Sequence, residues 1–114
     1  MNDIVRQEVT ATADKIVVKV GTRVLTDEQG RLDSQRISSL ASQLSQLAAQ
    51  SKKVVLVSSG AVAAGMNRLQ LDIRPADLSV LQAVAAVGQT DLMQAYQQEF
   101  ETHRQIAAQV LLTA

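Results

Sequence analysis

Two short stretches of the sequence combine residue types that could bind an anionic ligand. The first is Lys19-Val20-Gly21-Thr22, where a lysine stands near the end of an apolar, β-branched run. Its ammonium group, together with the backbone N–H groups and the hydroxyl that follow it, suits phosphate oxygens. The alternative for Lys19 alone is a side chain whose stem packs on the sheet while its charged head reaches solvent.

The second stretch is Ser58-Ser59-Gly60, which separates the apolar run at 54–57 from a run of small residues that begins at Ala61. A strand that turns directly into a helix marks the place where open α/β sheets bind ligands, and the first N–H groups of the helix favour an anion. Ser59 is expected to cap the helix or to offer its hydroxyl to a ligand, and Gly60 to admit a ligand close to the backbone. The stretch therefore predicts an anion- or carboxylate-binding corner.

Two predicted strands carry these stretches. Lys15–Val20 is rich in β-branched residues, and Val54–Val57 is typical of a fully buried parallel strand. Between them, Asp33 or Ser34 is expected to cap a helix with one apolar face. That face comprises Ile37, Leu40, Ala41, Leu44, Leu47 and Ala48. A strand–helix–strand unit implies a parallel pair of strands.

The rest of the chain predicts more α/β structure. A short helix is expected over 61–69, and Asp77 is expected to cap a long helix after a break that contains the only proline. Gly88 within that helix predicts close packing or a bend. The residues expected on its packed side are Leu78, Leu81, Ala85, Gly88, Leu92, Tyr96 and Phe100. Gln105–Thr113 predicts a third strand, and residues 1–14 predict a polar N-terminal arm or a short helix.

Composition excludes several classes of function. The formal net charge is zero and aromatic residues make up 2%, so neither a basic excess nor stacking platforms indicate a nucleic-acid partner. The chain has no cysteine, which removes disulfides and thiolate metal sites and fits a cytoplasmic location. Neither a signal peptide nor a run of roughly 18 apolar residues occurs, so no membrane partner is expected.

Familiar phosphate and catalytic motifs are absent. Gly60 and Gly65 have the spacing of the two glycines of a Walker loop, but Met66 and Asn67 replace its lysine and hydroxyl residue. No G-x-G-x-x-G follows either predicted strand. His103 is the only histidine, and it is expected at the surface near the end of a helix. The sequence itself therefore predicts no metal site and no serine–histidine–aspartate triad.

Four segments, taken together, carry a resemblance. They are KVGTRVL at Lys19–Leu25, VVLVSSGAVAAG at Val54–Gly65, AAVGQ at Ala85–Gln89 and QVLLT at Gln109–Thr113. In order and spacing they resemble the glutamate 5-kinase branch of the amino-acid kinase family, over residues 15 to 114. The resemblance implies an α/β fold, a three-layer αβα sandwich around a mainly parallel sheet.

The same resemblance implies an activity: transfer of the ATP γ-phosphoryl group to the γ-carboxylate of L-glutamate, the first step of proline biosynthesis. Lys19 takes the place of the lysine that contacts the nucleotide phosphates and the transferred phosphoryl group, with Gly21 and Thr22 in the accompanying loop. Ser59 takes the place of the serine that contacts glutamate, with Gly60 and Ala61 lining that site. ATP with Mg²⁺ and a homo-oligomeric complete enzyme are implied as well.

Family members continue with further glutamate-binding residues and a nucleotide-binding half. Residues 15–114 are therefore expected to be the N-terminal, substrate-side part of a kinase domain, inactive alone; a small complete domain is the alternative. Two other functions stay open at this point. One is a related amino-acid kinase with another acceptor, and the other is a non-catalytic amino-acid-binding or assembly module.

Overall fold

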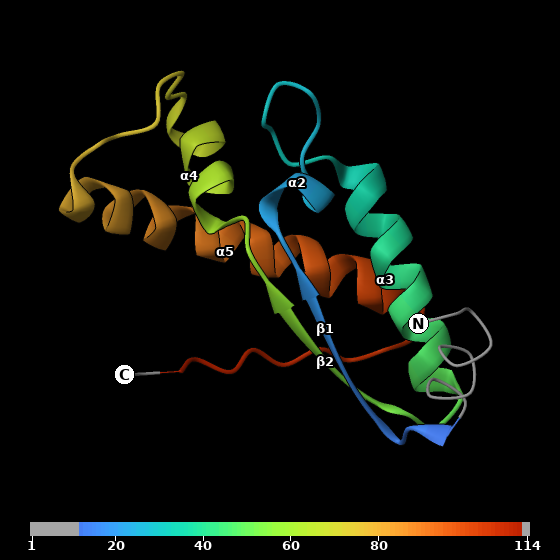
Figure 1. Cartoon of the computed structure of the whole chain (residues 1–114). Helices are drawn as coiled ribbons and strands as arrows, with labels where there is room; N and C mark the ends of the chain where they lie inside the picture. Colours follow the sequence, from blue (N-terminus) through green and yellow to red (C-terminus); the bar gives the residue numbers. More distant parts are fainter. Residues whose placement is uncertain (1–11, 113–114) are drawn as a thin grey trace, which may run out of the picture.

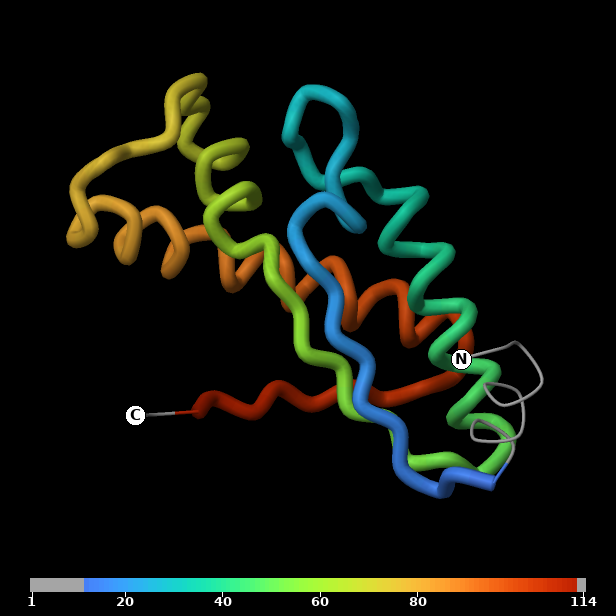
Figure 2. The backbone as a smooth tube through the Cα atoms, in the orientation of Figure 1, coloured from blue at the N-terminus to red at the C-terminus, as the bar shows by residue number. Residues whose placement is uncertain are grey.

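Two parallel strands form the sheet of this protein. The structure, a computed structural model, describes residues 12–112, so most of the predicted N-terminal arm lies outside the described residues. β1 (Lys15–Val20) and β2 (Lys53–Ser58) pair in parallel, with Lys15 opposite Lys53 and Val20 opposite Ser58. Both run toward the same edge, where the chain continues into α2 and α4 (Figure 2). The predicted parallel pair is confirmed.

Helices of the described part cover one face of this sheet. Side chains alternate between the two faces of a strand, so Ile16, Val18 and Val20 share the covered face with Val54 and Leu56. On the opposite face Val17 is 69% exposed, Val55 57% and Val57 49%. The prediction that 54–57 is fully buried is therefore wrong. The α/β class is confirmed, but within residues 12–112 a helical layer is present on only one side of the sheet.

The helix between the strands follows the sequence pattern closely. α3 (Ser34–Ala49) is capped by Asp33, whose carboxylate accepts a hydrogen bond of 2.9 Å from the backbone N–H of Gln35. Its face toward the sheet buries Ile37, Ala41 and Leu44. Before it, the short α2 (Thr22–Leu25) and a loop at 26–32 cross the edge of the sheet (Figure 1).

α4 and α5 form a closely packed pair beside the strand ends. α4 (Ala61–Leu69) has the predicted bounds, and α5 (Leu78–Thr102) begins at Asp77, whose carboxylate accepts hydrogen bonds from the N–H groups of Ser79 and Val80. The predicted packed side is correct from Gly88 to Tyr96, and Phe100 packs against the core as predicted. It is wrong at Leu78, which is 68% exposed, because α5 begins before it reaches α4 and buries Val84 instead.

The predicted third strand is absent from the described residues. Gln105–Leu112 is extended without strand structure, and the sheet has two strands. The segment runs across β1 and β2 rather than along them (Figure 1), so its backbone cannot form a ladder of hydrogen bonds with either strand. Its apolar side chains stay open, with Ile106 98% and Leu112 92% exposed. Apolar β-branched composition alone therefore predicted a strand, but the segment does not lie alongside β1 or β2.

The hydrophobic core lies beneath the carboxyl ends of the strands. It joins Val20 of β1, Leu25 of α2, Ile37 of α3, and Leu92 and Tyr96 of α5. Leu25 and Leu92 are fully buried. The turns that leave β1 and β2 thus rest on the best-packed part of the molecule. Among residues 12–112, no helix has both the length and the apolar character needed to cross a bilayer.

Candidate functional site

The two predicted corners lie side by side at one edge of the sheet. Because β1 and β2 are parallel and in register, the turn after Val20 and the turn after Ser58 leave the sheet at the same level. The backbone N–H of Ser59 donates a hydrogen bond of 2.9 Å to the carbonyl of Val20. The phosphate-type stretch and the serine–glycine stretch therefore form one site.

Lys19 stands on the open face of β1, opposite Val57. Its side chain is exposed, and the described residues offer it no hydrogen-bond or ion-pair partner. The ammonium group is therefore available to an anion at the strand edge. This placement suits the predicted contact with phosphate oxygens.

Gly21 and Thr22 follow Lys19 into α2. Gly21 precedes the helix in ordinary extended conformation (φ −84°, ψ 168°), and the space where a Cβ would stand is empty to 4 Å. Gly21 therefore leaves open space beside the backbone, and its backbone conformation does not require a glycine. Thr22 is exposed, and its carbonyl accepts a hydrogen bond of 3.0 Å from the Thr26 hydroxyl.

The two serines after β2 have different surroundings. Ser58 points to the covered face, and its hydroxyl donates to the Ser59 carbonyl at 2.8 Å and lies 2.6 Å from the Tyr96 hydroxyl. Ser59 is exposed. The N-cap of α4 is Gly60, without a side-chain capping hydrogen bond, so the expectation that Ser59 caps this helix is wrong. Its hydroxyl remains available to a ligand.

Gly60 makes the turn between β2 and α4 possible. Its backbone φ is +115°, a value that residues with a Cβ rarely adopt. The residue is buried, with Leu25, Leu32 and Leu92 in contact range of a Cβ built there. Gly60 thus fixes the direction in which Ala61 and the first turn of α4 leave the sheet.

Two further glycines bring α5 against α4. A Cβ on Gly65 would overlap the backbone carbonyl of Val84, and a Cβ on Gly88 would overlap the carbonyl of Ala61 and the backbone N of Gly65. The helices therefore touch backbone to backbone. The predicted close packing at Gly88 is confirmed. The role of Gly65 was missed, although it ends the same SSGAVAAG segment.

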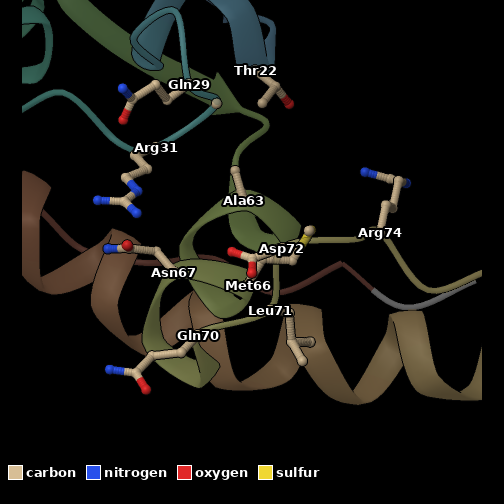
Figure 3. A pocket seen from close by; sticks show the side chains of 11 residues that line it. Thr22, Gln29, Arg31, Ala63, Met66, Asn67, Gln70, Leu71, Asp72 and Arg74 are labelled. Carbon is tan, nitrogen blue, oxygen red and sulfur yellow. The ribbon is translucent and has the colours of Figure 1, made fainter.

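A groove of about 860 Å³ opens next to the site, between the loop at 26–32 and α4 with the turn that follows it (Figure 3). Thr22 and Ala63 lie where it adjoins the strand ends. Arg31 and Asn67 point toward one another from its two sides, and Arg74 lies at its far end. Sequence reasoning missed these residues because their elements meet only in the fold; the signal was two arginines in turn segments that contain Gly30 and the only proline.

Tyr96 is the described ionisable group whose pKa departs clearly from its ordinary value. Burial raises the pKa of Tyr96, and the hydrogen bond with Ser58 opposes that effect. The phenol therefore stays protonated at neutral pH and can donate a hydrogen bond. His103, at the C-terminal cap of α5, is exposed as predicted.

The described residues suit the oxygens of an anionic group better than a metal ion. Lys19 supplies an open cation, with the small Gly21 and the Thr22 hydroxyl beside it. In the part of the chain that the structure describes, no group of three or more His, Asp or Glu side chains could hold a metal ion.

The sequence is similar to known proteins over nearly its whole length. The profile of the Amino acid kinase family matches residues 14–114. Glutamate 5-kinase of Rhodopirellula baltica is 48% identical over 113 residues, which are 98% of this chain and 29% of the relative. Glutamate 5-kinase of Enterococcus faecalis is 50% identical over 101 residues, 89% of this chain and 37% of the relative. The chain thus spans about a third of the length of these relatives.

Proposed function

This chain belongs to the amino acid kinase family, and from that premise we propose that it forms the acceptor-side part of a glutamate 5-kinase. In the proposed reaction an oxygen of the γ-carboxylate of L-glutamate attacks the γ-phosphorus of ATP. The bond to the ADP oxygen breaks, and γ-glutamyl phosphate and ADP result. The reaction would begin proline biosynthesis.

One observation carries the proposal: the two strand ends are joined by the hydrogen bond from Ser59 to Val20. Phosphoryl transfer depends on holding donor and acceptor in line and on neutralising the charge that is transferred, more than on covalent chemistry by the protein. A cationic corner beside a serine–glycine corner meets both needs. The distance between them is set by a parallel sheet, which is a rigid support.

In this proposal, different residues contact the phosphates and the glutamate. Lys19 contacts the phosphates and stabilises charge on the transferred phosphoryl group, and Gly21 and Thr22 let the phosphates approach the backbone. Ser59 donates its hydroxyl to glutamate. Gly60 and Ala61 shape the same site through the turn that they form.

The groove supports an acidic acceptor. Arg31 and Arg74 provide two guanidinium groups against the single carboxylate of Asp72 among its lining residues. A surplus of positive charge raises the local concentration of an anionic substrate. Glutamate, a dicarboxylate, therefore suits the groove, which Thr22 and Ala63 line near the strand ends.

Further parts of the proposal follow from the family resemblance. ATP with Mg²⁺ is the donor, the location is the cytoplasm, and the complete enzyme is a homo-oligomer. Mg²⁺, when bound, neutralises charge on the phosphates of the nucleotide.

An acceptor panel tests the function. Residues 14–114 replace the matching segment of the Rhodopirellula baltica enzyme, and ADP release is measured with L-glutamate, L-aspartate or N-acetyl-L-glutamate. We expect turnover with L-glutamate far above that with the other two acceptors. Preference for another acceptor would indicate a different amino-acid kinase. A folded chimera that glutamate stabilises against heat but that releases no ADP would indicate a non-catalytic binding module.

A further inference from the structure

We infer that Tyr96 is a positioning residue, which acts through Ser58 to hold the Ser59 peptide in place at the acceptor site. The inference rests on the proposed function for its kinetic consequence. Its structural part stands on the contacts of Tyr96 on α5, Ser58 at the end of β2 and Ser59, which follows β2. Nothing in the motif SSGAVAAG points to Tyr96, which lies on another element.

The hydrogen bonds have a defined direction. The Ser58 hydroxyl has one hydrogen, and it donates that hydrogen to the Ser59 carbonyl at 2.8 Å. The contact of 2.6 Å between Ser58 and Tyr96 must then use the phenol hydrogen as donor. A relay results, in which Tyr96 donates to Ser58 and Ser58 donates to the peptide of Ser59. Because burial raises its pKa, the phenol keeps this hydrogen across the neutral range.

With the relay, both backbone polar groups of Ser59 have hydrogen-bond partners. The N–H of Ser59 donates to the Val20 carbonyl at 2.9 Å, and the Ser59 carbonyl accepts from Ser58. Both backbone polar groups of Ser59 are therefore bonded, one to β1 and one toward α5. Only the exposed side chain of Ser59 is left for a ligand, and its direction is set by a backbone fixed on both sides.

The α5 helix is a firm support for the relay. Tyr96 is 4% exposed and belongs to the core, and its ring stacks on Phe100 with ring centroids 6.3 Å apart. Gly88 of the same helix contacts the backbone of Ala61, on the other side of the turn. α5 therefore holds the turn before Ser59 through Tyr96 and after Gly60 through Gly88.

A residue that only fills the core would behave differently from a positioning residue. Tyr96→Phe keeps the ring and its packing and removes the hydroxyl alone. If the hydroxyl only stabilised the fold, the variant would unfold at a lower temperature and bind glutamate normally. If it positions Ser59, the loss appears locally and in glutamate kinetics.

Amide hydrogen exchange of the 114-residue chain tests the structural part without any activity. Loss of one hydrogen bond of ordinary strength should speed exchange at Ser59 by about twofold to tenfold in Tyr96→Phe. The amides of Ala41 and Leu44 in α3 should keep their rates. Equal acceleration at all three amides, or none at Ser59, would overturn the inference.

Kinetics of the chimera with the Rhodopirellula baltica enzyme test the functional part. In Tyr96→Phe we expect the KM for glutamate to rise about twofold to tenfold, with kcat and the KM for ATP within about twofold of the parent. Ser58→Ala should show the same pattern, Ser58→Thr should restore the parent values, and the double variant Ser58→Ala/Tyr96→Phe should be no worse than Ser58→Ala.

Additive effects of the two substitutions, or an unchanged KM for glutamate, would contradict positioning through Ser58. A parent chimera that never phosphorylates glutamate would instead contradict the proposed function. The exchange measurement still decides the relay in that case, so the two failures are distinguishable.

Discussion

Lys19 and Ser59 lie at the carboxyl ends of neighbouring strands, and the proposed reaction gives them different steps. Lys19 is an open cation at the end of β1, whereas Ser59 offers a neutral hydroxyl beside the buried Gly60. A cation that meets charge on the transferred phosphoryl group should act mainly in the transition state. A hydroxyl that contacts the acceptor should act already when glutamate binds.

Lys19→Ala in the chimera should therefore lower kcat by about a hundredfold or more and leave the KM for glutamate within about twofold. Steady-state kinetics measure both constants. Lys15→Ala is the matched control, because Lys15 is also exposed on β1 but lies at its other end. Equal losses in the two variants, or full turnover in Lys19→Ala, would remove Lys19 from the catalytic role.

Ser59→Ala should raise the KM for glutamate about tenfold or more, because a hydrogen bond to a charged group contributes about 1.5–3 kcal/mol. The KM for ATP should not change. Since Ser59 caps no helix, thermal unfolding should also be unchanged, whereas loss of a cap would cost about 1 kcal/mol. A destabilised variant with normal glutamate kinetics would show that the serine is structural.

Tyr96 can be observed directly, because it is the only tyrosine and the chain has no tryptophan. Its phenolate absorbance should titrate with a midpoint above the ordinary pKa of 10.0. A raised folded pKa means that its contribution to stability is full below the unfolded pKa and is lost as pH rises through the folded value. Titration at or below 10.0 in the folded chain would contradict the buried placement.

At the scale of elements, the glycine contacts between α4 and α5 fix the position of the turn from β2 into α4. A methyl group at Gly88 would have to displace the backbone of Ala61 and Gly65. Gly88→Ala should therefore destabilise the chain by about 1–3 kcal/mol in urea unfolding, as overpacking does. Gly21→Ala, where the space is open and φ is −84°, is the control and should have little effect on stability. A neutral Gly88→Ala would show that the helices do not touch as described.

Elements that depend on local signals could be predicted from the sequence. β1 and α4 have the predicted bounds, and the aspartates at positions 33 and 77 cap α3 and α5, because apolar period and capping residues act within a few residues. The strand predicted at the end of the chain is wrong because a strand must also lie alongside another strand, and local composition does not reveal how a segment is oriented. The open face of β2 was missed for a similar reason: burial depends on what packs there.

In the candidate site, too, features set by local sequence could be predicted and features set by tertiary packing could not. Lys19 and Ser59 could be singled out because one lies near the carboxyl end of a predicted strand and the other lies just beyond such an end. Parallel pairing of the two strands brings these ends together. The Tyr96–Ser58 contact and the groove with Arg31 and Arg74 could not be predicted, because they join elements distant in sequence. The glycine at position 88 was predicted to pack closely, but its contact with Ala61 appears only in the fold.

At the scale of the whole molecule, the described residues hold the proposed acceptor corner and the lysine proposed to bind phosphate. They contain no cluster of metal-binding side chains, and the chain spans 29% of the Rhodopirellula baltica enzyme. The 114-residue chain alone should therefore show no glutamate-dependent ADP formation, since misplacement by about 1 Å can already cost 10²-fold. A coupled ADP assay on the purified monomer, with the chimera as positive control, measures this. Turnover by the monomer would mean that these residues suffice for catalysis.

The central claim is the proposal that this chain, as part of a complete enzyme, directs a phosphoryl group to the γ-carboxylate of glutamate. Acyl phosphates react with hydroxylamine, so the most direct measurement is the formation of γ-glutamyl hydroxamate from ATP, L-glutamate and hydroxylamine by the chimera. We predict hydroxamate in an amount equal to the ADP released, and its loss in Lys19→Ala. ADP release without hydroxamate would show that the phosphoryl group goes to water or to another atom, and would contradict the account.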